Sequence, residues 1–344
     1  MREIIIGEKE AGQRLDKFLG KYLNQATKSF LYKMLRKKNI TLNEKKAEGF
    51  EKLLKGDQIK IFFTEETLEK FSKSEFEQEE GEIIPEMEKR ILSILFENKH
   101  ILVINKPAGM LSQKAKKEDV SLVEHIMEYL LQSGALTKEE YKGFHPGICN
   151  RLDRNTSGII VAGKTMEGLQ TMGKLFKERD LDKFYYCIVK GDLLKKEGIE
   201  GYLYKNHNHN RVSIHKEPIE NGDYIKTQYE PILRNGEFTL LKVKLITGKS
   251  HQIRAHLQSI GHPIIGDGKY GDVLTNKYFR KKFKLKHQLL HAAQLTFPKL
   301  DNENGWEELS EKTITAPLPD YFETILLTLF EGGEKLCHHG IPEV

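Results

Sequence analysis

Little in this 344-residue chain suggests a secreted, membrane-bound or disulfide-linked protein. Its three cysteines, Cys149, Cys187 and Cys337, are scattered and form neither a disulfide framework nor a pair with metal-ligand spacing. No segment approaches the roughly 20 apolar residues that a membrane helix needs. The apolar run near Met1 is far too short for a signal peptide. We therefore expect a cytoplasmic protein that does not contact a membrane.

Cofactor motifs are lacking as well. The chain has no GxGxxG between a strand and a helix, and no phosphate-binding loop motif. The thirteen histidines are dispersed, and His207 and His209 are better explained as exposed loop residues than as metal ligands. These absences predict a protein that works without a nucleotide cofactor and without a metal.

Charge is unevenly distributed along the first ninety residues. From Lys28 to Lys60 there are ten Lys or Arg against four Asp or Glu, whereas Glu65 to Arg90 has ten Glu against four Lys or Arg. A basic module followed by an acidic segment is typical of a polyanion-binding domain on a solvated linker. Charge alone fits equally well with two ordinary solvated surfaces.

Residues 1–64 have the pattern of a small α+β domain. Apolar residues recur at helical spacing in 14–23 and 29–38, and strand-like runs follow at 39–43 and 58–63. The succession RLDKFL, LRKKNITLN and KLLKGDQIKI resembles the small RNA-binding domain named after ribosomal protein S-four. A basic cluster would supply its phosphate contacts, namely Arg36, Lys37, Lys38, Lys45 and Lys46. We expect residues 65–90 to be a flexible acidic linker that tethers this domain.

Beyond Ile91 the chain alternates short strands with a few helices. Its predicted strands are 100–105, 158–163, 184–190, 223–233 and 238–246, with apolar runs at 263–265 and 288–297. Its predicted helices are 120–133, 166–178 and 320–330. This order indicates an α+β domain with a mixed sheet over residues 91–330, followed by a loose tail at 331–344.

Three segments of this second domain are rich in reactive side chains. The first, NRLDRNTSG at 150–158, places Asp153 between Arg151 and Arg154. Two neighbouring cations favour the ionised carboxylate, which is a plausible nucleophile, although a structural salt bridge would use the same residues. The second segment is TGKSHQIRAH at 247–256, followed by GHPIIGDGKYG. The third, KFYY at 183–186, opens a strand, where an aromatic residue either packs in the core or stacks on a base.

Together these segments resemble the Rlu-type family of pseudouridine synthases. The family pattern HRLDRxTSG compares with NRLDRNTSG here. Four more blocks resemble family patterns in consistent order: KPxG at 106–109, KxYxAxVxG at 183–191, TGRxHQIRxH at 247–256 and LHA at 290–292. The resemblance implies a mixed sheet with an active cleft along it. It also implies an enzyme that converts uridine in RNA to pseudouridine without a cofactor.

The resemblance also implies roles for individual residues. Asp153 matches the catalytic aspartate, Tyr185 the tyrosine that lies against the target base, and Arg254 the basic partner of the aspartate. The neighbouring polar residues would bind substrate: Arg151, Arg154, Lys249, His251, Gln252 and Lys106. Two departures from the family pattern bear on the site: Asn150 replaces a common His, and Lys249 replaces a common Arg. We expect Asn150 to support the site by hydrogen bonds without reacting.

The expected partner is RNA, with large-subunit ribosomal RNA as first choice and transfer RNA as second, and the enzyme is expected to be a monomer. A non-catalytic assembly factor would have lost Asp153, Tyr185 or Arg254, and all three are present. A zinc-dependent base deaminase would need an HxE and a PCxxC, and neither occurs. The sequence therefore favours a pseudouridine synthase over both alternatives.

Overall fold

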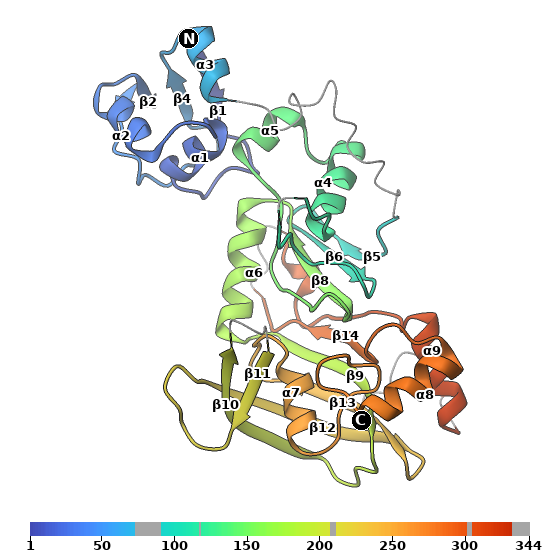
Figure 1. The fold of residues 1–344 in the computed structure, drawn as a ribbon. Coiled ribbons are helices and arrows are strands. Elements are labelled where there is room, and N and C mark those ends of the chain that lie inside the picture. Colours follow the sequence, from blue (N-terminus) through green and yellow to red (C-terminus); the bar gives the residue numbers. More distant parts are fainter. Residues whose placement is uncertain (73–90, 117, 207–210, 301–304, 332–344) are drawn as a thin grey trace.

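The computed structural model describes residues 1–72, 91–116, 118–206, 211–300 and 305–331. A small N-terminal unit and a larger unit built on one mixed sheet follow each other along the chain (Figure 1). The predicted α+β class is confirmed. The predicted tail lies outside the described residues except for Glu331.

The N-terminal unit packs its helices on a four-stranded antiparallel sheet of order β1-β4-β2-β3. Its core consists of the apolar residues that recur at helical spacing, among them Leu15, Phe18 and Leu35. Its elements are β1 (Arg2–Ile5), α1 (Leu15–Tyr22), α2 (Lys28–Arg36), β2 (Ile40–Leu42), β3 (Lys45–Lys46), β4 (Gln58–Ile61) and α3 (Glu65–Phe71).

Helix α3 changes the expected boundary of the linker. Thr64 caps it by accepting a hydrogen bond from the Thr67 amide, and Leu68 is buried in the N-terminal core. The amide of Gln25 also donates to the carbonyl of Phe71 at 3.0 Å. Residues 65–71 therefore belong to the N-terminal unit, because this turn of helix buries an apolar residue that composition alone could not place. The rest of the expected linker, 73–90, lies outside the described residues.

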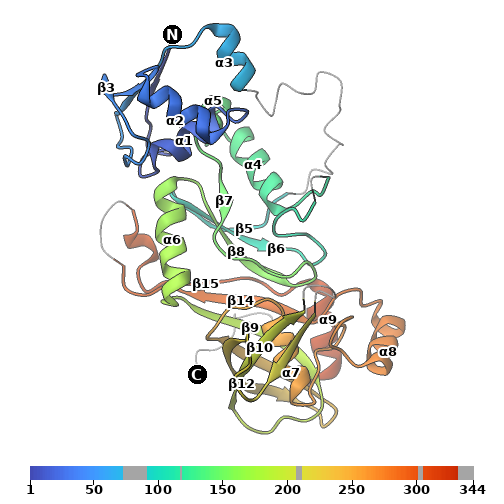
Figure 2. The ribbon, with the colours of Figure 1, turned by 60° about the vertical axis from the view of Figure 1, so that its left-hand side comes forward.

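The N-terminal unit is docked on the larger unit. Its helix α1 lies beside α5 (Lys138–Gly143) in Figures 1 and 2. The Tyr22 hydroxyl donates to Glu139 at 3.1 Å, and the Gln13 amide donates to the carbonyl of Gly143 at 3.1 Å. The Phe18 ring packs so closely on Gly143 that a Cβ there would lie 2.4 Å from it. The expectation of a loosely tethered module is therefore replaced by a buried interface, which only the folded chain brings together.

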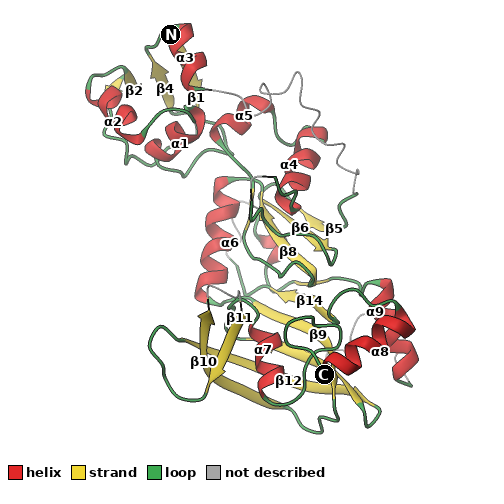
Figure 3. Cartoon of the chain, viewed as in Figure 1, coloured by secondary structure: helices red, strands yellow, loops and turns green. Residues whose placement is uncertain are grey.

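The larger unit is an eleven-stranded mixed sheet with the order β11-β10-β12-β13-β9-β14-β8-β6-β5, in which β15 also pairs with β14 and β7 with β8. Figure 3 shows the strands in yellow, with α4 and α6 beside β6 and β8. Its strands are β5 (Ile94–Glu97), β6 (Ile101–Lys106), β7 (Gly147–Ile148), β8 (Ser157–Gly163), β9 (Asp182–Lys190), β10 (Glu197–Asn206), β11 (Arg211–His215), β12 (Asp223–Arg234), β13 (Phe238–Leu245), β14 (Leu290–Thr296) and β15 (Thr313–Thr315). Its remaining helices are α4 (Leu122–Gln132), α6 (Met166–Glu178), α7 (Gln252–Ser259), α8 (Val273–Phe283), the 3-10 turn η1 (Glu307–Leu309) and α9 (Asp320–Leu329).

Strands β6 and β8 are buried on both faces because a helix covers each side. Leu102 and Ile104 share a core with α4, whereas Ile101 and Val103 face the core that contains Met172 of α6. Since successive side chains of a strand point to opposite faces, such a strand has a continuous apolar run. That run is why the segment 100–105 was predictable as a buried strand.

The two halves of the sheet join where β14 runs between β8 and β9. The pair β8·β14 is parallel, with Ser157 opposite His291 and Gly158 opposite Ala292. Gly158 has a φ of +114°, and a Cβ there would lie 2.2 Å from the carbonyl oxygen of Ala292. Only glycine permits this close approach. The junction brings the loop that precedes β8 against the segment before β14, where Gln288 donates to the Thr156 hydroxyl at 2.8 Å.

Candidate active site

The loop 150–156 enters the junction between β7 and β8 and carries Asp153. The Asn150 side chain ties this loop to β8, because its amide donates to the carbonyl of Ile159 at 3.1 Å and its oxygen accepts from the Val161 amide at 2.8 Å. The Ser112 hydroxyl donates to the carbonyl of Leu152 at 2.7 Å on the other side. Asn150 therefore holds the loop by hydrogen bonds, as expected, and Asp153 stands on a fixed backbone.

Lys106 holds the same loop in place by hydrogen bonds. Its ammonium group donates to the carbonyls of Pro107 at 2.9 Å, Met110 at 2.9 Å and Arg154 at 3.2 Å, and the side chain is fully buried. Burial lowers the pKa of Lys106 to about 7, against the opposing influence of the Asp153 charge. Lys106 is therefore placed to position the loop, with its donors occupied by the protein.

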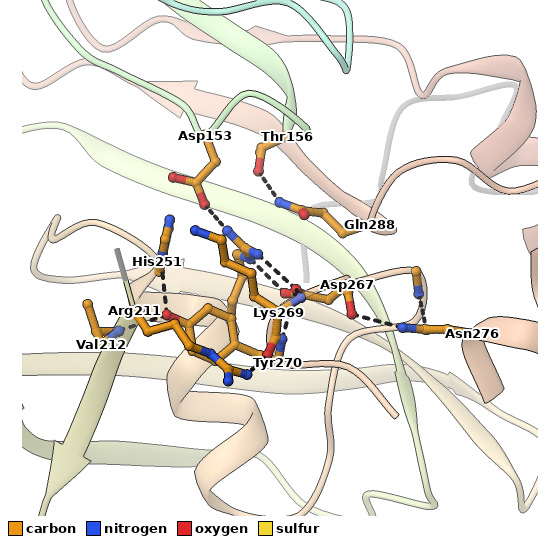
Figure 4. A network of polar contacts seen from close by, with 12 residues as sticks. Asp153, Thr156, Arg211, Val212, His251, Asp267, Lys269, Tyr270, Asn276 and Gln288 are labelled. Atoms are coloured by element: carbon orange, nitrogen blue, oxygen red, sulfur yellow. Dashed lines mark hydrogen bonds and ion pairs between the residues drawn. The ribbon is translucent and has the colours of Figure 1, made fainter. Parts of the chain in front are cut away.

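Arg254 on α7 joins two carboxylates in one network (Figure 4). Its Nη1 donates to Asp153 at 2.7 Å, while Nε and Nη2 donate to the two oxygens of Asp267 at 2.6 and 2.8 Å. The side chain of Asp267 is 0% exposed, that of Arg254 is 7% exposed and that of Asp153 is 25% exposed. The buried end of the network is thus neutralised within the protein, and the open end presents a carboxylate to the solvent side.

The surroundings of Asp267 keep it ionised despite its burial. Burial alone would raise the pKa of Asp267, but the hydrogen bonds and charge of Arg254, with the amides of Lys269 and Tyr270, outweigh it and lower the pKa. For Arg254, burial opposes the charged form, and its two carboxylate partners raise the pKa above the ordinary value. Sequence reasoning missed Asp267. Its signal was a single carboxylate in the glycine-rich segment GHPIIGDGKYG.

Tyr185 lies in β9, within reach of the electrostatic influence of Asp153. It is 8% exposed and shares a core with Leu152 and Ile253, which flank Asp153 and Arg254 in the chain. Burial, and then the charge of Asp153, raise the pKa of the Tyr185 hydroxyl above its ordinary value. The structure therefore brings Asp153, Arg254 and Tyr185 into one site, although they come from a loop, a helix and a strand.

His251 and Tyr270 form one wall of this site. His251 precedes α7 with a left-handed φ of 58°, and its Nδ1 lies 3.0 Å from the Tyr270 hydroxyl. That hydroxyl accepts a hydrogen bond from the Val212 amide at 2.9 Å, and the guanidinium group of Arg254 lies over the Tyr270 ring. Burial is the main cause that lowers the pKa of His251. A neutral imidazole is therefore expected here near pH 7.

The other residues predicted to bind substrate occupy different environments. Gln252 is buried and uses its amide in bonds to Thr227 and the carbonyl of Lys226, and it accepts a bond from the Thr247 hydroxyl, so its contacts are structural. Lys249 is exposed and pairs with Asp223 at 2.7 Å. Arg151 and Arg154 are exposed on the loop, and Arg154 donates to the carbonyl of Gly109 at 3.1 Å.

The basic cluster of the N-terminal unit is gathered at one end of it. Arg36 ends α2, two lysines follow at once, and β3 carries the other two. All five are exposed, and none forms an ion pair with any residue that the structure describes: Arg36, Lys37, Lys38, Lys45 and Lys46. Five unpaired cations on neighbouring segments favour phosphate contacts.

Within the described ranges, no group of three or more His, Cys, Asp or Glu side chains is arranged to hold a metal ion. His207 and His209 lie outside these ranges. No helix among the described residues is both long and apolar enough to cross a bilayer.

Comparisons with known proteins agree on one family. A family model described as RNA pseudouridylate synthase matches residues 100–259. The protein named ribosomal large subunit pseudouridine synthase C of Vibrio parahaemolyticus is 30% identical over 325 residues, which cover 94% of this chain and 95% of that protein. The synthase named D of Borreliella burgdorferi is 31% identical over 273 residues, 77% of this chain and 78% of that protein.

Solved structures show the same fold. The human RNA pseudouridylate synthase domain containing 4 aligns with a TM-score of 0.55 at 23% identity, covering 69% of this chain and 92% of that one. The family model and the two bacterial relatives show an isomerase that acts on RNA. The chain belongs to the RNA pseudouridylate synthase family, and it isomerises uridine in RNA to pseudouridine.

Proposed function

We propose that Asp153 is the group that acts on the target uridine, with Arg254 as its ionic partner and Tyr185 against the base. The observation that carries this assignment is the asymmetric network of Arg254. Its buried side is neutralised by Asp267, and its 2.7 Å bond to Asp153 aims a partly exposed carboxylate at the solvent side. A fixed charge in such a site needs no reorganisation when the reaction begins.

The reaction breaks the N1–C1′ glycosidic bond of uridine, turns the uracil and joins its C5 to C1′. Atoms are rearranged without net oxidation or reduction, so the residues themselves can supply the chemistry. Asp153 provides the ionised carboxylate, and Tyr185 provides an aromatic surface for the detached base. The target uridine must leave its stack to reach them, at a cost of roughly a few kcal/mol, so a looped or single-stranded RNA is the natural substrate.

Two groups of residues support this step. Arg151, Arg154 and Lys249 are exposed and His251 contacts Tyr270, and these four residues would contact the RNA strand. Lys106 and Gln252 act as positioning residues, because their polar atoms are bonded to the protein.

RNA affinity would come in part from the N-terminal unit, which we propose to be an S-four-type RNA-binding domain. Its cluster of Arg36, Lys37, Lys38, Lys45 and Lys46 is exposed and unpaired within the described structure. Because the unit is docked through α1 and α5, these cations stand at a fixed place relative to Asp153. A docked module of this kind adds affinity for RNA. Its fixed position also restricts which uridines can reach Asp153 while the module is bound.

Large-subunit ribosomal RNA is the substrate that the relatives favour, since the two bacterial relatives carry the ribosomal large subunit in their names. Transfer RNA is the second candidate. We infer a monomeric enzyme of the cytoplasm. Mapping pseudouridines in ribosomal and transfer RNA from a deletion strain and its parent tests the substrate, and sites lost only from transfer RNA would overturn the first choice.

The catalytic assignment is tested with Asp153→Asn. The variant should fold, because Asp267 still balances Arg254 and the Asn oxygen can still accept its hydrogen bond. We expect RNA binding to persist and pseudouridine formation to be lost. The matched control is Asp192→Asn, which changes an exposed carboxylate paired with Arg234 and should keep wild-type turnover. Full activity of Asp153→Asn would refute the mechanism.

A further inference from the structure

A second strongly cationic surface lies on the catalytic domain. Residues 273–287, VLTNKYFRKKFKLKH, contain six Lys or Arg and no Asp or Glu. They comprise helix α8 and the loop that returns the chain to β14. We call this surface the α8 face, defined by Lys277, Arg280, Lys281, Lys282, Lys284 and Lys286.

The α8 face is open to solvent. All six cations are exposed, and none forms an ion pair with an acidic group in the part of the chain described by the structure. Phe279 is the buried residue through which α8 packs on the domain, whereas Tyr278 is 49% exposed. The Lys282 ammonium lies 5.5 Å from the centre of the Tyr278 ring. Exposed cations beside an exposed aromatic ring are typical of a surface that binds single-stranded nucleic acid.

Both ends of this segment are bonded to the catalytic site. At the start of α8, the Asn276 amide donates to the carbonyl of Asp267 at 2.8 Å, and its oxygen accepts from the Gly266 amide at 2.7 Å. Beyond the loop, Gln288 donates to the Thr156 hydroxyl at 2.8 Å, in the loop that carries Asp153. The α8 face is therefore held in place relative to the carboxylate.

A cavity of about 540 Å³ continues from the α8 face toward the catalytic loop. Its lining includes Lys284, Lys286 and His287 from the α8 segment, and residues 106–108 with Met110. The Lys106 ammonium group bonds to the carbonyl of Arg154, next to Asp153. A hollow with cationic and apolar walls can take a nucleotide, because it offers contacts for both phosphate and base.

We propose that the α8 face binds the phosphates of the RNA strand that flanks the target uridine. The inference rests on the proposed role of Asp153, since it places the strand next to that residue. Its six cations would add an RNA contact that is independent of the N-terminal basic cluster. A protein partner is less favoured, because six cations with no acidic residue match a polyanion better than a mixed protein surface.

The test is a charge-removal variant, Lys277→Gln, Lys281→Gln and Lys286→Gln together. The matched control removes three exposed lysines elsewhere, Lys174→Gln, Lys177→Gln and Lys195→Gln. Two of these lie on α6, across the catalytic domain from α8 in Figures 1 and 2. The probe is large-subunit ribosomal RNA transcribed in vitro from the same genome. Affinity is measured at several salt concentrations, with pseudouridine formation measured on the same samples.

Each lost phosphate contact removes roughly 0.7–0.9 from the salt slope of binding. The α8 variant should therefore lose about two units of slope and bind roughly tenfold or more weakly near 0.1 M salt. The control should match the wild type in affinity, slope and turnover. Circular dichroism and thermal unfolding verify that both variants fold, and the charge-preserving Lys→Arg triple variant should restore binding.

Three results would overturn the proposal. One is an unchanged salt slope in the folded α8 variant. Another is an equal loss of slope in the control, which would show that any surface lysine contributes. If the α8 variant bound the transcript with wild-type affinity but bound ribosomal particles more weakly, the α8 face would contact a protein. That result would also overturn the proposal. If the wild-type protein failed to form pseudouridine, the proposed function itself would be contradicted. Pseudouridine formation is measured on the same samples, so this failure is distinguished from a loss of binding.

Discussion

Replacing Asp267 with Asn tests whether the buried end of the Arg254 network controls the site. The side chain of Asp267 is 0% exposed and accepts four hydrogen bonds, two from Arg254 and two from backbone amides. Asn has one acceptor oxygen, so its NH2 group must point at one of these donors. Arg254 would also lose its buried counter-charge.

Breaking a buried ion pair by neutralising one partner costs about 3–5 kcal/mol. We expect a loss of this order in the free energy of unfolding, measured with urea at pH 7. Single-turnover pseudouridine formation should fall as well, because Arg254 would shift toward Asp153 as its remaining carboxylate partner. The matched control is Asp192→Asn, an exposed carboxylate paired with exposed Arg234, for which we expect little change in either quantity.

The Arg254 network also predicts the direction in which the free energy of unfolding changes at acidic pH. The folded pKa of Asp267 is lowered, so its contribution to stability is fully present above the unfolded pKa of about 4 and is lost as the pH falls through the folded value. Wild-type unfolding free energy should drop steeply below about pH 4. The Asp267→Asn variant should show a shallower drop. A loss of less than about 1 kcal/mol at pH 7, or identical acid profiles, would refute this account of the network.

Three further changes test the rest of the site. Tyr185→Ala should slow single-turnover chemistry more than it weakens RNA binding, and Tyr185→Phe measures the hydroxyl separately; weakened binding with normal chemistry would contradict the stacking role. Asn150→His should retain substantial turnover, because a neutral imidazole offers one donor and one acceptor, and complete loss in a folded variant would give Asn150 a direct role. Gly143→Ala should separate the two domains, since its Cβ would lie 2.4 Å from the Phe18 ring; an unchanged radius of gyration in X-ray scattering would count against the interface.

Local patterns in the sequence predicted much of the fold. Helix α6 begins and ends where the spacing of apolar residues predicts, at 166–178, and β6 and β8 follow from their continuous apolar runs. These elements were predictable because their buried residues are apolar and regularly spaced. Helix α7 was not predicted, because its buried face includes Gln252, Arg254 and His256, which a hydrophobic pattern counts as exposed.

The sequence by itself determined the loop at 150–156, the acidic group on it, and the exposed cations of the N-terminal unit, since motif and charge are properties of the local chain. Tertiary structure alone decided that Arg254, 101 residues from Asp153, reaches it, and that Asp267 holds Arg254 in turn. It also decided that Lys106 is buried and that the N-terminal unit is docked. The physical reason is that burial and hydrogen-bond partners depend on which elements meet at the β8–β14–β9 junction and at α5. The identity of a residue does not show which distant elements it will contact.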